Sequence, residues 1–282
     1  MRARDLGVVI GEHPPGPDNA ITDVAGVRVG HTTLQADGRT AVRTGVTVVV
    51  PHDDIWTEPV FAGSHRLNGS GEMTGLDWVR ESGELTTAIG LTNTHSVGVV
   101  RDELVAAQVR ARGEGLYWSL PVVGETYDGL LNDINGFHVR PDHVRAALDH
   151  ATAAPPAEGN VGGGTGMICH GFKGGIGTAS RVTDTATGRY TVGVLVQANH
   201  GRRERLRING VAVGELITGD DIPLPELPDR YEPGSGSIIV VVATDAPLLP
   251  HQCTRLAQRA ALAVGRLGGT GEQYSGDLML AF

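Results

Sequence analysis

Several residue types are scarce in this chain of 282 residues, and each scarcity excludes a class of protein. The two cysteines, Cys169 and Cys253, are too few for a disulfide framework or a cysteine-rich zinc site, so we expect two buried free thiols. Aromatic residues make up 4% of the chain, so the core must be built from Val, Leu, Ile and Ala. No apolar run reaches the roughly 18 residues of a membrane-spanning helix, and residues 1–16 lack the apolar core of a signal peptide. We therefore predict a cytoplasmic protein with no membrane partner.

Basic residues and metal-binding motifs are sparse as well. Lys and Arg number 23 against 32 Asp and Glu, a net charge of −9, and they form no block, which argues against a nucleic-acid partner. Eleven histidines occur, but neighbouring pairs such as His138 with His143, or His143 with His150, match no metal motif with a third ligand nearby. The glycine-rich segment 159–181 matches neither common nucleotide-binding loop, and close backbone packing explains its glycines better. We predict neither a metal nor an organic cofactor.

What the chain does contain is glycine, proline and β-branched residues. The 41 glycines and 15 prolines make up about a fifth of the sequence, and apolar residues make up 40%, enough for a sizeable core. β-Branched runs predict strands at 27–30, 45–50, 87–95, 121–126, 190–199 and 237–246. Periodicity and end signals predict helices at 101–113, 140–152 (with Asp142 as the N-cap) and 250–268. Because strands and helices do not alternate strictly, we predict a single domain, 1–282, of layered α/β or α+β type.

The most informative position is the junction between the segment 221–236, which carries four prolines, and the strand that follows it. Ser237 opens a buried aliphatic run and directly follows Gly236. If the bond between them were cut, Ser237 would gain an α-amine with a pKa of ~7.7–8.0 beside its own hydroxyl, and that amine is a suitable base for the nucleophile. Gly236 has no Cβ to hinder attack of the hydroxyl on its carbonyl. The alternative is a plain turn into a strand, which is the commoner meaning of a Gly-Ser pair.

Two pairs of polar residues stand two positions apart, so that in an extended chain each pair faces one side. Ser275 and Asp277 would place a hydroxyl relay beside a carboxylate. Glu125 and Tyr127 would place a carboxylate for a substrate amine beside a phenol that donates to an oxyanion. Asn199, at the end of a strand, is a further candidate oxyanion donor. Taken singly, residues of this kind more often have an ordinary structural role.

Taken in order, these segments resemble one family. From residue 19 to the C-terminal end the chain contains NAITDVAGVRVGH, GEMTG, TNTHSVG, GETYDG, LNDINGF, GTGMICHGFKGGIGTASR, VLVQANHGRR, GSIIVVVATDAPLLPHQ and SGD. The ordered set resembles the DmpA-type L-aminopeptidase/D-esterase family, which also includes the β-peptidyl aminopeptidases. The resemblance implies a four-layer αββα sandwich of the N-terminal-nucleophile type and an enzyme that works without a cofactor.

The resemblance also implies self-processing. Family members cleave themselves, here between Gly236 and Ser237, into an α chain, 1–236, and a β chain, 237–282. They assemble as multimers of the processed heterodimer, so we expect a homo-oligomer. Only seven residues follow Ser275, whereas family members continue further, so either the β chain is naturally short or this sequence omits its C-terminal part.

The roles of the family's site residues carry over to the matching positions of this chain. Ser237 matches the nucleophile, Ser275 the serine that hydrogen-bonds to it, and Asp277 the nearby acidic residue. Some β-peptidyl members have Glu at that acidic position, so the resemblance leaves the preference between α- and β-peptides open.

Three further positions match groups that hold the substrate. Tyr127 and Asn199 match the groups assigned to the oxyanion. Glu125 matches the carboxylate that binds the free amine of the substrate. The partner expected from this set is a small peptide, amide or ester with a free amine.

Three functions follow from these observations. The first is a serine aminopeptidase, amidase or esterase that releases N-terminal residues through an acyl-enzyme on Ser237. The second is an acyltransferase of related fold; such enzymes typically cleave before Thr, so the Ser here argues against it. The third is an uncleaved, inactive binding protein whose glycine-rich loop holds an anion.

Overall fold

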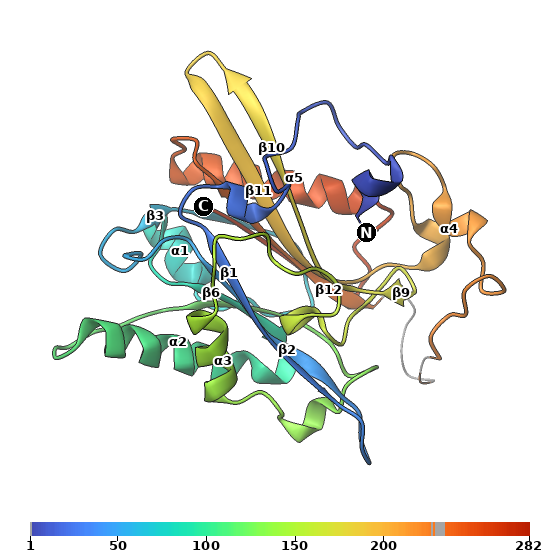
Figure 1. Ribbon diagram of the computed structural model, residues 1–282, viewed down its shortest axis with the longest axis horizontal. Helices are drawn as coiled ribbons and strands as arrows, with labels where there is room; N and C mark the ends of the chain where they lie inside the picture. Colours follow the sequence, from blue (N-terminus) through green and yellow to red (C-terminus); the bar gives the residue numbers. More distant parts are fainter. Residues whose placement is uncertain (1, 227, 229–234) are drawn as a thin grey trace.

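The computed structural model describes residues 2–226, 228 and 235–282, and two main β-sheets organise it (Figure 1). The four-stranded sheet has the order β1 (Arg28–Ala36), β2 (Val42–Val50), β6 (Ile89–Asn93) and β7 (Val122–Thr126). The five-stranded sheet has the order β10 (Gly175–Thr185), β11 (Gly188–Asn199), β12 (Gly236–Thr244), β13 (Ser275–Ala281) and β4 (Gly63–Gly69). Neighbouring strands are antiparallel except for β6 with β7 and β12 with β13, which are parallel.

Shorter elements connect the sheets. Two small ladders pair β3 (Val60–Phe61) with β5 (Glu84–Leu85), and β8 (Ile168–Cys169) with β9 (Phe172–Lys173). The α-helices are α1 (Leu76–Ser82), α2 (Val97–Arg112), α3 (Pro141–Asp149), α4 (Val213–Leu216) and α5 (Pro250–Arg266). Single 3₁₀ turns occupy Ala3–Leu6, Ile21–Asp23, Thr94–Ser96, Ile134–Gly136, Gly162–Gly164 and Arg203–Arg205. Within the described ranges, none of these helices is both long and apolar enough to cross a membrane.

The two sheets pack face to face and enclose the main core. Leu91 on β6 and Ile239 on β12 belong to one buried aliphatic cluster that draws on both sheets. The sheets approach closely where β7 crosses β12, because Gly124 lies against Ile239 and a Cβ there would come within 3.1 Å of the isoleucine side chain. This close approach places the residue after Gly124, which is Glu125, near the start of β12.

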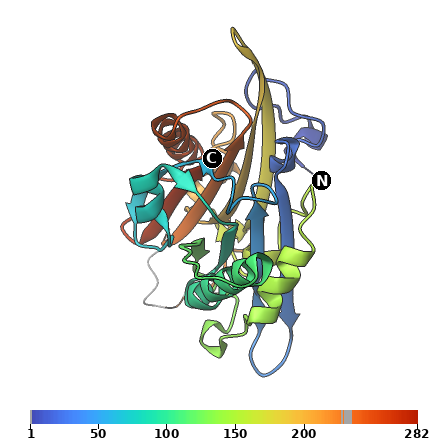
Figure 2. The same cartoon turned by 90° about the vertical axis from the view of Figure 1, so that its left-hand side faces the viewer.

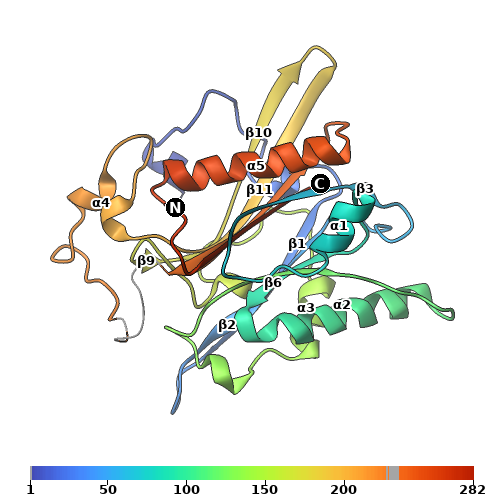
Figure 3. The same ribbon diagram turned by 180° about the vertical axis from the view of Figure 1, so that it is seen from behind.

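Helices cover the outer faces of both sheets. Val100 and Leu104 of α2 and Val144 of α3 pack against Val48 of β2 in a second buried cluster. On the other sheet, Ala257 of α5 packs with Val240 of β12 in a third cluster (Figure 3). Strands β2 and β12 are therefore covered on both faces, which is why they read as continuous apolar runs. The layers follow the αββα order, which confirms the predicted sandwich.

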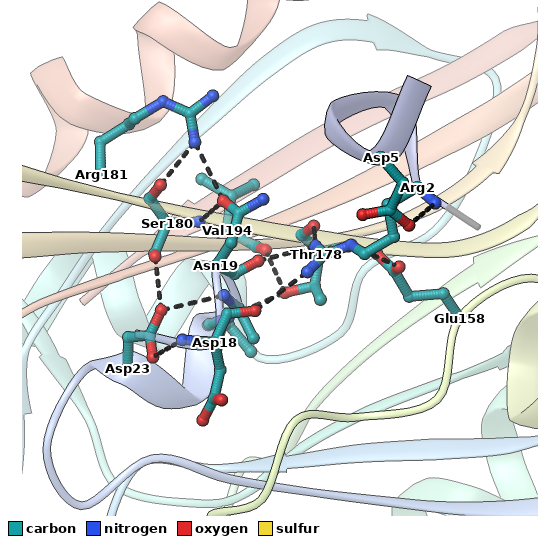
Figure 4. Close-up of polar contacts among 12 residues, drawn as sticks. Arg2, Asp5, Asp18, Asn19, Asp23, Glu158, Thr178, Ser180, Arg181 and Val194 are labelled. Atoms are coloured by element: carbon teal, nitrogen blue, oxygen red, sulfur yellow. Dashed lines mark hydrogen bonds and ion pairs between the residues drawn. The ribbon is translucent and has the colours of Figure 1, made fainter. Parts of the chain in front are cut away.

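The N-terminal segment lies over β10 and is attached to it by polar contacts. The guanidinium of Arg2 donates to the carbonyl oxygens of Asn19, at 2.7 Å, and Thr178, at 2.5 Å (Figure 4). The hydroxyl of Ser180 donates to a carboxylate oxygen of Asp23 at 2.5 Å. Beyond these contacts β10 and β11 extend as a long hairpin that projects past the rest of the molecule (Figure 2).

Most predicted elements are present, with shifted ends. The strand expected at 27–30 runs on to Ala36, because it pairs with β2 along its whole length. The helix expected at 101–113 begins at Val97, directly after a 3₁₀ turn. The helix expected at 140–152 ends at Asp149, and its N-cap is Arg140 rather than Asp142. Asp142 lies in the first turn instead, where its carboxylate pairs with Arg145 at 3.0 Å.

Three strands of the main sheets, the four strands of the two small ladders and one thiol differ from expectation. Strands β4, β10 and β13 were not predicted, since their Gly, Ser, Thr and Asp residues hide the β pattern. Part of the glycine-rich segment 159–181 is thus a ladder strand as well as a closely packed loop. Both cysteines are free and Cys253 is buried, but Cys169 is only partly buried. Of the proline-rich segment 221–236, residues 227 and 229–234 lie outside the described residues.

Candidate active site

Ser237 sits near the beginning of β12, paired with a neighbour on each side. It is opposite Asn199 of β11 and opposite Gly276 of β13, and it is 2% exposed. A serine at a fully paired strand position has a fixed backbone and little rotational freedom, which suits a nucleophile that needs a defined direction of attack. The predicted nucleophile is therefore rigidly held at the end of the sheet.

Gly236 is required by packing as well as by chemistry. A Cβ at this position would overlap the carbonyl oxygen of Asn199 and lie 3.2 Å from the Cα of His200. The backbone of β11 thus leaves no room for a side chain next to Ser237. The sequence explained this glycine only by access to its carbonyl; the structure adds the close approach of the neighbouring strand.

Ser275 and Asp277 flank the Gly236–Ser237 peptide unit from the neighbouring strand. In the parallel register Ser275 is opposite Gly236, and Asp277 is opposite the residue after Ser237. The hydroxyl of Ser275 donates to Asp277 Oδ1 at 2.6 Å, and both residues are buried. Burial raises the pKa of the Asp277 carboxyl, and the hydrogen bond from Ser275 partly offsets that rise. The prediction that these two side chains face one side of the strand is confirmed.

A cavity of about 400 Å³ opens beside Ser237, of a size that suits a small ligand. Its walls are formed by residues from the ends of several elements: Ser70, Gly71, Glu72, Thr94, Glu125, Tyr127, Ser235, Gly236, Ser237 and Tyr274. Glu125 and Tyr127 therefore face one cavity, as their spacing predicted. Ser275, Asp277 and Asn199 lie behind the wall, on the strands that hold Ser237.

Glu125 is a buried carboxylate with defined hydrogen bonds. Its Oε1 accepts the backbone N–H of Glu72 at 2.9 Å, and its Oε2 accepts the hydroxyl of Thr94. It is 3% exposed, and burial raises the pKa of its carboxyl, with the nearby charge of Glu72 acting in the same direction. Because this buried carboxylate has lost most of its hydration, it attracts a cationic group in the cavity more strongly than an exposed carboxylate would.

Asn199 links the two sides of the site. Its Oδ1 accepts the backbone N–H of Ile168 at 2.8 Å, and its Nδ2 donates to the carbonyl oxygen of Tyr127 at 2.8 Å. The amide therefore has a fixed orientation: one N–H donates to Tyr127, and the second N–H can donate to a bound ligand. It is 4% exposed and lies directly across the ladder from Ser237.

Sequence reasoning gave no role to several residues of the cavity wall. Glu72 and Thr94 hold the carboxylate of Glu125, and both lie in segments, GEMTG and TNTHSVG, that carried the family resemblance. Gly71 packs against Gly276, where a Cβ would meet the Cα of Gly276 at 2.8 Å and Glu125 Oε1 at 3.0 Å. The motifs marked these residues, but only the fold shows what they touch.

Comparisons with known proteins identify the family and the fold of this chain. Residues 19–282 match peptidase family S58. The chain is 52% identical over 294 residues to a beta-peptidyl aminopeptidase, BapA, of Sphingosinicella microcystinivorans, a match that covers 100% of this chain and 74% of the relative. Its fold resembles that of a beta-aminopeptidase of Burkholderia sp., with a TM-score of 0.90 and 58% identity over 100% of this chain and 77% of that one.

A second solved structure is similar at lower identity. The L-aminopeptidase D-Ala-esterase/amidase of Ochrobactrum anthropi matches with a TM-score of 0.88 and 46% identity, over 100% of this chain and 77% of that chain. That protein is described as a variant of the Ntn hydrolase fold and a prototype of the serine aminopeptidases. Fold and relatives together define a hydrolase of the serine aminopeptidase, amidase and esterase class. The chain belongs to peptidase family S58.

Proposed function

We propose that this chain is a self-processing aminopeptidase in which Ser237 is the nucleophile for its own cleavage and for every later turnover. The observation that carries the proposal is the placement of Ser237. It lies directly after a glycine that has no room for a side chain, and it opens on a cavity whose far wall holds the buried carboxylate of Glu125. The relatives supply independent support for the class of reaction.

Processing begins with attack of the Ser237 hydroxyl oxygen on the carbonyl carbon of Gly236. The C–O bond forms, the C–N bond of the peptide breaks, and the Ser237 nitrogen takes a proton to become an amine. Water then hydrolyses the ester and leaves the carboxylate of Gly236. The pairing of Ser275 with Gly236 across the ladder, and its hydrogen bond to Asp277, support a role for these two side chains in holding the released amine.

Turnover uses the amine that processing has released. Ser237 Oγ attacks the scissile carbonyl of the substrate while its own α-amine accepts the hydroxyl proton. The tetrahedral oxygen receives hydrogen bonds from the phenol of Tyr127 and the remaining N–H of Asn199. The amine passes its proton to the leaving group, and water resolves the acyl-enzyme.

Glu125 makes the reaction an exopeptidase reaction. Its buried carboxylate binds the free ammonium of the substrate, so the residue that carries this ammonium is the one released. A charge-assisted hydrogen bond of this kind contributes about 1.5–3 kcal/mol. The names of the relatives, which include beta-peptidyl aminopeptidases and an L-aminopeptidase D-Ala-esterase/amidase, lead us to propose short α- and β-peptides, amides and esters as substrates.

The test compares wild type with Ser237→Ala by SDS-PAGE, intact mass and hydrolysis of aminoacyl p-nitroanilides. We expect wild type to yield two chains, 1–236 and 237–282, and the variant to remain whole and lose about 10⁶-fold in kcat. Ser82→Ala, which changes a serine of α1 outside the cavity wall, is the control and should process normally. Activity in a wild-type chain that stays uncut would overturn the proposal.

Acyl transfer is a separate outcome of the same assay. Products formed with an added acceptor amine, in excess of hydrolysis, would favour the acyltransferase alternative. The cytoplasmic location and the homo-oligomer of processed heterodimers remain predictions. Size-exclusion chromatography with light scattering would test the oligomer.

A further inference from the structure

A cluster of metal-ligating side chains lies on the α5 face of the five-stranded sheet, opposite to the face on which Ser237 borders its cavity. Cys169 ends β8, His170 follows it, and His200 comes directly after β11. One ligand atom from each, Sγ or a ring nitrogen, lies within 4.8 Å of those of the other two. The two imidazole rings meet edge to face with centroids 5.1 Å apart. The residues come from two chain segments about thirty positions apart, so no short sequence motif brings them together.

His170 is a buried histidine with only one of its two ring nitrogens paired among the described residues. Its Nδ1 lies 3.0 Å from the carbonyl oxygen of Arg202, which can only accept, so Nδ1 bears the proton and Nε2 has the lone pair. Nε2 is buried without a hydrogen-bond partner among the described residues, and the side chain is 4% exposed. Metal-bound histidines typically donate their second nitrogen to a carbonyl in this manner. Nδ1 of His170 is therefore bonded to a carbonyl oxygen, and the lone pair of Nε2 is available to bind a cation.

The backbone at His170 is held in an unusual conformation. Its φ is +50°, in the left-handed region that residues other than glycine seldom adopt. The backbone N–H of His170 donates to the carbonyl oxygen of His200 at 2.7 Å, which fixes this turn against the end of β11. The surrounding contacts thus keep the His170 ring directed at His200 despite the strain.

The other two groups complete a donor set. The ring of His200 is 4% exposed, and in its neutral form it offers the lone pair of one ring nitrogen. The Cys169 thiol lies beside it, with the ligand atoms of the three residues within 4.8 Å of one another. A bound cation would displace that thiol proton, as cations do at cysteine ligands. One thiolate and two imidazoles favour zinc-like ions over magnesium or calcium, which take oxygen ligands.

There is also space for an external ligand. The three residues line one end of a cavity of about 390 Å³ between the five-stranded sheet and α5, whose other walls are mainly apolar. Three protein ligands with an open fourth position are the usual arrangement of an accessible zinc site. For zinc, ligand atoms in tetrahedral contact would be about 3.5 Å apart, so the cluster must contract by roughly 1 Å when the ion binds.

We propose that Cys169, His170 and His200 form a binding site for a zinc-class divalent cation, distinct from the serine site. The ion bonds to Cys169 Sγ, His170 Nε2 and one ring nitrogen of His200, with water in the fourth position. Because the backbone N–H of Ile168, the residue before Cys169, holds Asn199 Oδ1, the bound ion fixes the same segment that orients Asn199.

The full chain is stripped with a chelator and then titrated with Zn²⁺ alone and with Co²⁺ alone. We expect about one Zn²⁺ retained per chain after dialysis and a thiolate-to-cobalt charge-transfer band in the near ultraviolet. Wild type that retains no Zn²⁺, or a Co²⁺ spectrum without the thiolate band, overturns the proposal. The spectrum needs no variant, so it decides the matter even if a substitution prevents folding.

Variants then locate the ion. Cys169→Ser, His170→Gln and His200→Gln should each weaken Zn²⁺ binding more than about tenfold, since even an indirect partner of a ligand contributes that much. Cys253→Ala, the other free thiol, and His251→Gln, an exposed residue of α5, should bind as wild type does. Equal binding by folded Cys169→Ser, checked by circular dichroism, would overturn the assignment of the thiol.

Discussion

Asn199 and His200 are adjacent in sequence yet lie in opposite surroundings. The amide of Asn199 points between the two sheets, where Ile168 and Tyr127 satisfy it with backbone groups. The ring of His200 lies on the face covered by α5, where His200 and His170 both line a mainly apolar cavity. Alternation along a strand sends consecutive side chains to opposite faces, so one strand end serves two sites.

The difference between the two faces concerns how polar groups are satisfied. At the serine site between the sheets, the carboxylate of Glu125 accepts hydrogen bonds from the hydroxyl of Thr94 and the backbone N–H of Glu72, and it is in position before any ligand arrives. On the α5 face, Nε2 of His170 has no hydrogen-bond partner among the described residues, and a buried polar atom left unpaired destabilises the fold. A preorganised site favours catalysis, whereas an unsatisfied cluster gains stability only when something binds to it.

Gly236→Ala should disturb both faces at once and have the largest effect. Its new Cβ overlaps the carbonyl of Asn199 and crowds His200, so we expect a loss of about 1–3 kcal/mol in the free energy of unfolding. The displaced Ser237 should also fail to cleave the chain, which intact mass would show. Gly265→Ala in α5 is the control, because a Cβ there meets nothing within 4 Å. It should process normally and gain up to about 1 kcal/mol in stability. Normal processing of Gly236→Ala would contradict the prediction.

Tyr127→Phe tests the catalytic face alone. Removing the phenolic hydroxyl takes away one donor to the tetrahedral oxygen, and we expect kcat to fall about 10²–10³-fold with little change in KM. Steady-state kinetics on the processed enzyme measures this. Tyr190→Phe, in the exposed β10–β11 hairpin, removes a hydroxyl that contacts only its own turn and should leave kcat unchanged. A Tyr127→Phe enzyme with wild-type kcat would remove this residue from the mechanism.

Glu125→Gln tests whether the cavity selects a free amine. The amide keeps an acceptor for Glu72 but loses the charge, so kcat/KM for substrates with a free amine should fall roughly tenfold to hundredfold. The preference over N-acetylated substrates should shrink by the same factor. Glu103→Gln is the matched control, since Glu103 is also a buried carboxylate but pairs with Arg110 and Arg145. Unchanged selectivity in Glu125→Gln would show that the ammonium binds elsewhere.

The smallest expected effect is on the pH dependence of kcat/KM. Because burial raises the pKa of Glu125, kcat/KM should fall as pH decreases through a value above that of an ordinary carboxyl, where the group loses its charge. The folded chain holds this proton more tightly than the unfolded chain, so the group's contribution to stability also declines as pH rises over the same interval.

Thr94→Val removes a hydrogen bond that favours the charged form and should move this acid limb to higher pH. The exposed Thr57→Val should not move it. Glu125→Gln should abolish this limb and keep the separate decline below ~7.7–8.0 that comes from protonation of the Ser237 α-amine, the base of the reaction. A second limb that survives in Glu125→Gln belongs to another group, for which Asp277→Asn is the next variant to measure.

Sequence patterns predicted some elements well because the signals were local. Strand β12 is a continuous apolar run, and α5 begins with Pro250 at its first turn and is amphipathic. Strand β10 gave little signal, because its Gly, Thr and Ser residues become a strand only through an eleven-residue register with β11. Strand β13 was likewise recognised only as an extended pair of polar residues, since its partners β12 and β4 lie far away along the chain.

Local sequence was enough to predict three things: the nucleophile at the Gly236–Ser237 junction, the shared direction of the polar pairs two residues apart and, through the ordered motifs, the family. These features depend on neighbours along the chain, whose relative directions the backbone fixes. The tertiary structure alone decided that Thr94 and Glu72 hold Glu125, and that His200 meets Cys169 and His170. Those contacts join segments that meet only when the strands pair and the sheets pack, so no spacing along the chain encodes them.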